Sequence, residues 1–104
     1  MTNEEVQIAA FEIILNSGNS RTTVHEAFAA MREGEYDKAS ELLESANEEL
    51  LLAHKAQTHL LQEYAGGTEI TIEIIMVHAQ DHLMTTMTLR EVAIEMLELY
   101  KRIK

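Results

Sequence analysis

Two histidines and an aspartate lie within five positions of one another in the stretch "VHAQDHLMT", residues 77–85. In a helix, His78, Asp81 and His82 share roughly 100° of the surface, because each residue turns the chain by about 100°. Their neighbours are mostly apolar, so a charged form of any of the three would lose hydration there. Spacing alone leaves two interpretations open: polar groups satisfied inside a core, or a chemical site.

Different chemistries make different demands on such a trio. A metal-dependent hydrolase would use His78 and His82 as an i, i+4 ligand pair, but the chain has no HExxH motif. A di-iron bundle needs Glu-x-x-His pairs, and no histidine here follows a glutamate at that spacing. A phosphohistidine carrier needs one imidazole with a free nitrogen, held in one tautomer, and donors for the phosphoryl oxygens. His78 with its neighbours meets that requirement.

The rest of the chain predicts three long helices and two short connections. Thr2 and Glu5 have capping-box spacing, and a three-four apolar rhythm continues through "NSGNSR" to a C-terminal glycine, Gly34. A second helix is predicted from about Tyr36 to Tyr64, ended by two glycines, and a third from a cap at Thr68 to about Arg102. Short connections favour antiparallel neighbours, so residues 1–104 are expected to form a single all-α domain, an antiparallel up-down three-helix bundle.

The third helix does not fit a chain that stands alone. Residues 74–89 are apolar nearly all round, which is typical of a helix surrounded by others. Two partner helices cannot cover every side of it, so the remaining face predicts a homo-oligomer with closed symmetry.

Composition narrows the classes of function. The formal net charge is −10, which disfavours nucleic acid and anionic membrane surfaces as partners. The most apolar stretch, 70–89, carries several charged and polar side chains, so no membrane insertion is expected. The acidic N-terminus lacks a signal-peptide layout, and we expect a cytoplasmic protein.

Five stretches together resemble a known family: "EEVQ", "FEII", "SR", "AHKAQTHLL" and, most specifically, "HAQDHLMTT". Over essentially its whole length the chain is similar to the lactose/cellobiose-type IIA component of the bacterial phosphoenolpyruvate-dependent sugar phosphotransferase system. The segment "NSGNSR" departs from the family, whose members tend to have small residues before the arginine.

The resemblance implies an assembly and a site. The assembly would be a homotrimer of nine helices. His78 would accept a phosphoryl group from the phosphocarrier protein HPr and pass it to a cysteine of the cognate IIB component. Asp81 would lie on the threefold axis, where three copies share a divalent metal ion. Three converging carboxylates repel one another, so Mg²⁺ or a similar hard cation suits them.

Two further residues are candidates for supporting roles. Gln80 is roughly 200° around the helix from His78, so it can serve only the imidazole of a neighbouring subunit, by donating to the phosphate. His82 would orient His78 or donate to the phosphate. With a helix starting near Thr68, His78 would lie about nine residues inside it, too far for the terminal amides to bind the anion. The other histidines, His25, His54 and His59, are expected on solvated faces.

Two alternatives belong to other classes. "REGEYDKASELLESA" resembles one tetratricopeptide hairpin, which would make the chain a helical adaptor, but no repeat of it follows. A metal-binding regulatory bundle would use His78, Asp81 and His82 as ligands. For the carrier, the sugar is a β-linked disaccharide of the cellobiose, chitobiose or lactose type, and "HAQDH" leans weakly toward the cellobiose type.

Overall fold

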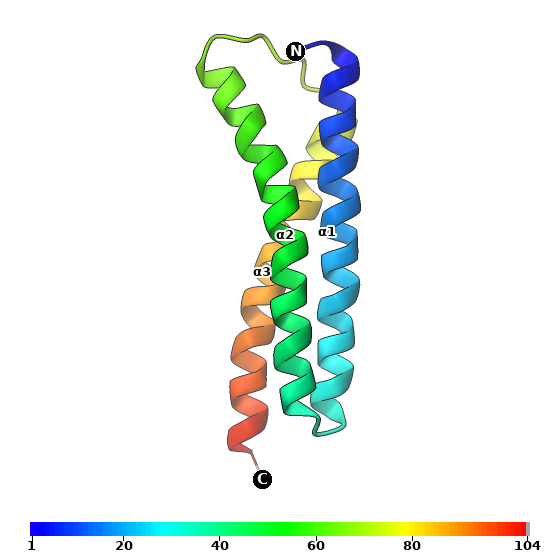
Figure 1. The fold of residues 1–104 in the computed structure, drawn as a ribbon, viewed down its shortest axis with the longest axis vertical. Coiled ribbons are helices and arrows are strands. Elements are labelled where there is room, and N and C mark those ends of the chain that lie inside the picture. The colour runs from blue at the N-terminus through cyan, green and yellow to red at the C-terminus, as the bar shows by residue number, and fades with distance from the viewer. Residues whose placement is uncertain (104) are drawn as a thin grey trace.

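The computed structural model describes residues 1–103, so Lys104 of the predicted domain lies outside the described residues. Three helices, α1 (Asn3–Arg32), α2 (Tyr36–Ala65) and α3 (Ile74–Arg102), form an up-down-up bundle with extents of 54 × 19 × 18 Å (Figure 1). No strand occurs in the described part of the chain, which confirms the all-α prediction. Among residues 1–103, no helix is both long enough and apolar enough to span a membrane.

Helix α1 begins and ends as its sequence predicts. The Thr2 hydroxyl accepts from the Glu5 amide at 3.1 Å while the Glu5 carboxylate accepts from the Thr2 amide at 3.1 Å, which completes the capping box. The helix continues unbroken through "NSGNSR". Gly34 takes the left-handed conformation that follows many helices, with φ of +75°, and turns the chain into α2.

The connection between α2 and α3 differs from the prediction. Thr68 was expected to cap the third helix; instead its hydroxyl donates to the Glu63 carboxylate at 3.0 Å, and its amide donates to the Glu63 carbonyl. Thr68 therefore closes α2, and α3 begins only at Ile74, after Glu73. The intervening "TEITIE" is rich in β-branched residues, whose side chains lose rotamer freedom in a helix and favour extended backbone. The prediction of a helix from Thr68 was wrong for this reason.

The core consists of two apolar clusters, one in each half of the bundle. The half that also contains His78, here called the His78 half, is built on one cluster, which comprises Val6, Ala10, Ile13, Leu50, Ala53, Leu60, Met76, Ala79 and Leu83. The opposite half is built on the other, which comprises Val24, Ala27, Ala30, Met31, Ala39, Leu43, Ala46, Ala93 and Leu97. Between them, the buried Ser20 hydroxyl donates to the Ala46 carbonyl at 2.8 Å, which ties α1 to α2.

Helix α3 has an inner seam and an outer face. The inner seam is buried and comprises Met76, Ala79, Leu83, Thr86, Ala93 and Leu97. The outer face, defined by Ile74, Val77, Asp81 and Met84 at helical spacing, is exposed, with Ile74 at 89% and Val77 at 58%. One chain thus leaves a side of its most apolar helix uncovered, as the sequence predicts.

Candidate functional site

His78 lies close to the start of α3. It is the fifth residue of the helix and its side chain is exposed. The expectation that it lies about nine residues inside the helix was wrong, because α3 starts later than predicted. The backbone of His78 is about 6 Å along the helix axis from the first helical residue, Ile74, at 1.5 Å per residue. Because its side chain is exposed, His78 can meet another molecule.

His82 lies one turn further along α3, on the side of that helix that faces α1. The two imidazole rings have centroids 5.7 Å apart and are tilted by 43°. His82 is half-buried, and a Cβ placed on Gly18 would lie 3.8 Å from its Nε2, an ordinary van der Waals distance. The ring therefore packs over the bare backbone of α1 at Gly18. This contact places His78 and His82 together on the flank of α3 that faces α1.

Asp81 lies on the outer face, between Val77 and Met84. Its side chain is exposed, and its backbone carbonyl accepts from the Thr85 hydroxyl at 2.8 Å. Neither His78 nor Asp81 is buried within one chain, so the interpretation of the trio as satisfied core groups was wrong. An exposed carboxylate in the middle of an apolar face is instead suited to a contact between chains.

One chain does not assemble a metal site. Within residues 1–103, no group of three or more His, Cys, Asp or Glu side chains is placed to hold a metal ion. The alternative of a metal-binding regulatory bundle, with all ligands from one chain, is therefore not supported. An ion bound by Asp81 would need carboxylates from further copies.

Gln80 lies on the flank of α3 that faces α2. Its amide oxygen accepts a hydrogen bond from Gln57 Nε2 of α2, and its amide nitrogen donates to Met76 Sδ at 3.6 Å. It does not contact the His78 of its own chain in this arrangement, as the angle between them predicts. Beside it is a largely apolar groove of about 220 Å³, lined by Leu60, Leu61, Tyr64, Ile70, Ile72, Met76 and Gln80.

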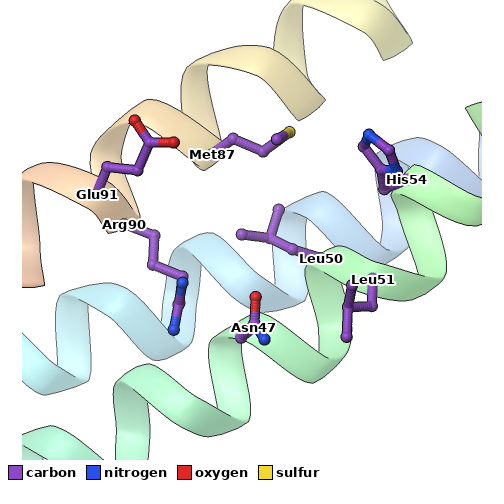
Figure 2. Close-up of a pocket in the computed structure, with 7 residues that line it drawn as sticks. All are labelled: Asn47, Leu50, Leu51, His54, Met87, Arg90 and Glu91. Carbon is purple, nitrogen blue, oxygen red and sulfur yellow. The ribbon is translucent and has the colours of Figure 1, made fainter.

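A second groove, of about 250 Å³, follows the same flank further along α2 and α3 (Figure 2). Met87 and His54 lie at one end of it and Arg90 and Asn47 at the other. Arg90 Nε donates to the Leu43 carbonyl at 2.8 Å and so links α3 to α2. His54 is exposed on this groove, and His25 and His59 are exposed elsewhere, as predicted.

Sequence reasoning missed Gln57. Gln57 is half-buried on α2, and its side-chain amide donates to Gln80 of α3. A signal was present, since an amide among apolar residues requires a partner when buried. Gln57 belongs to "AHKAQTHLL", one of the stretches that carries the family resemblance.

Fold and site together define a three-helix bundle that presents an exposed histidine on its third helix. The chain belongs to the family "PTS system, Lactose/Cellobiose specific IIA subunit", which matches residues 8–101. This confirms the resemblance and replaces the alternative of a helical adaptor.

Relatives and solved structures agree with this family. The chain is 46% identical over 102 residues to a "PTS system lactose-specific EIIA component" of Staphylococcus epidermidis, covering 98% of both chains. The crystal structure of PtcA from S. mutans is similar with a TM-score of 0.97 at 76% identity, covering 98% of this chain and 100% of that one. The IIA(Chitobiose) of Escherichia coli, solved in complex with HPr, is similar with a TM-score of 0.80 at 31% identity, covering 93% of this chain and 94% of that one.

Proposed function

We propose that the protein is a phosphocarrier that accepts a phosphoryl group from HPr on His78 and passes it to a cysteine of its IIB component during uptake of a β-linked disaccharide. The observation that carries the proposal is the exposed imidazole of His78 within "HAQDHLMTT", in a chain that matches the IIA family over residues 8–101. The complex of the related IIA(Chitobiose) with HPr supports HPr as the donor.

The chemistry requires little from the protein beyond position. A lone pair of the neutral His78 ring attacks the phosphorus in line, and the bond between phosphorus and HPr breaks as the nitrogen–phosphorus bond forms. In the second transfer, a IIB thiolate attacks the same phosphorus, and the ring nitrogen is the leaving group. The exposure of His78 lets both partners reach it in turn. His82, whose ring centroid is 5.7 Å away, would steady the His78 ring or donate to the phosphate.

The uncovered outer face of α3 supports assembly as a homotrimer of nine helices. In a ring of three with Asp81 on the axis, each contact joins different flanks of two subunits. The α1 flank of one subunit, with His78 and His82, would then face the α2 flank of the next, with Gln80. Each phosphoryl site would be a groove between subunits, in which Gln80 of the neighbour donates to the phosphate.

Asp81 is the proposed ligand for a shared divalent ion, Mg²⁺ or a similar hard cation. The residue fits this role because its exposed carboxylate lies on an apolar face, where three copies would converge without neutralising side chains of their own. The ion would cancel their repulsion. Asp81→Leu should stay trimeric, since apolar packing replaces the three charges, and should lose the metal. Sedimentation and metal analysis test this, and an ion retained by the trimeric variant would exclude Asp81 as its ligand.

Phosphorylation in vitro tests the carrier role. Incubation with phosphoenolpyruvate, enzyme I and HPr should give one acid-labile phosphate per chain in the wild type and none in His78→Ala. His25→Ala is the matched control, because His25 is also exposed on a helix. A wild type that gains no phosphate, or a His78→Ala variant that gains as much as the wild type, would refute the assignment. Growth on single disaccharides with candidate IIB and IIC partners would then identify the sugar.

A further inference from the structure

Two carboxamide side chains meet where α2 packs on α3, on the flank away from His78. Gln57 and Gln80 are both half-buried, and Gln57 Nε2 donates to Gln80 Oε1. Gln80 Nε2 in turn donates to Met76 Sδ at 3.6 Å. The three side chains form a short chain of hydrogen bonds from one helix to the other.

The contact with Met76 agrees with the direction in which Gln57 holds the Gln80 amide. A thioether sulfur accepts hydrogen bonds and cannot donate them, so the NH₂ end of Gln80 must be the end beside Met76. The carbonyl end then faces α2, where it needs a donor, and Gln57 supplies one. Because an amide has two hydrogens and Met76 takes one, the other N–H of Gln80 remains available to the groove beside it.

The direction of this amide matters for an anion. Phosphoryl oxygens only accept, so an outward N–H stabilises a nearby phosphate and an outward carbonyl oxygen repels it. A glutamine side chain that is free to rotate would present both ends and would lose entropy each time it bound. A partner that holds the oxygen inward removes both problems.

We infer that Gln57 is a positioning residue, which holds the amide of Gln80 with its N–H outward toward the phosphoryl group on the neighbouring subunit's His78. This inference rests on the proposed function. It adds a residue that does not touch the phosphate and acts only through Gln80.

Two substitutions at Gln57 separate its donor from its shape. Gln57→Met keeps the length of the side chain but donates nothing, so the Gln80 amide becomes free to turn. Gln57→Glu is isosteric and only accepts, so it draws the Gln80 NH₂ inward and turns the carbonyl outward. Gln62→Glu adds the same charge at an exposed position of α2 and controls for it. Gln80→Leu removes the donor itself.

The measured quantity is the ratio of phosphorylated chain to phosphorylated HPr at equilibrium, by phosphorus NMR. Gln80→Leu should lower it about 10-fold, as expected for loss of a hydrogen bond to a charged group. Gln57→Glu should lower it at least as much, Gln57→Met less, and Gln62→Glu hardly at all. The double variant Gln57→Met/Gln80→Leu should have a ratio no lower than that of Gln80→Leu alone, because both substitutions act through one amide.

A role in packing alone predicts different results. It would lower the stability of the fold without changing the phosphorylation ratio, and it would leave the side-chain amide signals of Gln80 unmoved when His78 is phosphorylated. Equal ratios for Gln57→Glu and Gln62→Glu would overturn the inference while His78 remained the phosphoryl acceptor. Failure of the carrier role is distinct, since the wild type would then gain no phosphate at all. Sedimentation tests whether each variant compared is still a trimer. If Gln57→Glu is not a trimer, the comparison of Gln57→Met with the wild type decides the case, because Met is neutral and of similar shape.

Discussion

The surfaces of the two halves of the bundle differ in composition. Around the opposite half, charged side chains form ion pairs within the chain, such as Lys38 with Glu35 and Lys101 with Glu98. Around the His78 half, large apolar side chains are left on the surface, and most of those that the bundle exposes are found there: Ile8, Phe11, Leu15, Leu51, Leu52, Leu61, Tyr64, Ile72, Ile74, Val77 and Met84.

This difference separates folding from assembly. Exposed ion pairs add little stability, but they keep the surface hydrated and discourage association. An apolar surface of the extent found in the His78 half is typical of a contact with another protein. The opposite half therefore exposes less apolar surface than the His78 half, and the His78 half is where contacts with sister chains and visiting partners are proposed.

Among the substitutions that distinguish the two halves, Phe11→Glu is expected to have the largest effect. The Phe11 side chain is 61% exposed on α1. If it packs against a neighbouring subunit, Phe11→Glu forfeits about 2–3 kcal/mol at each of three contacts, which is enough to release monomers. Sedimentation velocity should show dissociation, while circular dichroism shows the three helices retained.

Ala29 gives a matched control for this substitution. It lies five turns further along the same face of α1, at the opposite half, and it is also exposed. Ala29→Glu should leave the trimer intact. Equal dissociation by both substitutions would mean that the contact runs along the whole of α1 and that the two halves do not differ in this way.

A core substitution in the opposite half should do the reverse. Leu43 is 3% exposed, and Leu43→Ala should lower the free energy of unfolding by about 2–5 kcal/mol through lost burial and the cavity it leaves. Assembly should persist at concentrations where the chain is folded. Urea unfolding at several protein concentrations measures both effects, with the exposed Ser45→Ala as a control expected to change stability by less than about 0.5 kcal/mol.

Much of the fold could be predicted because its signals are local. The Thr2 and Glu5 cap and the glycines after α1 and α2 each act through their own backbone, so they are visible in the sequence. The start of α3 is not local in this sense. Thr68 is a good cap in isolation, and only its bonds to Glu63 show that it belongs to the end of α2.

The site was predicted less evenly. His78 and Asp81 stand out by residue type and spacing, but a helix that is apolar nearly all round does not show which side turns inward. Contacts settle that question, since Met76 and Leu83 meet the other helices and Asp81 does not. Gln57 was missed because its role depends on a partner on another helix.

The smallest expected effect concerns the free end of the His78 half, where the chain starts. Two hydrogen bonds from Thr2 lower the pKa of the Glu5 carboxyl below its ordinary 4.5. The bond from the Thr2 backbone amide has the larger effect, and the bond from the Thr2 hydroxyl has the smaller one. The folded state therefore binds the proton less readily than the unfolded state, so the charged carboxylate stabilises the fold above pH 4.5 and this contribution is lost as the pH falls through the lowered pKa. Because Glu5 is fully exposed, solvent keeps the contribution small.

The Tm of the wild type should slightly exceed that of Glu5→Gln at neutral pH, at matched protein concentration, and the two should converge well below pH 4.5. A difference in Tm that widened on acidification would show that the charge on Glu5 opposes the fold, so that the Thr2 hydroxyl and the apolar contacts of this half, and not the Glu5 carboxylate, hold the first turn of α1 in place.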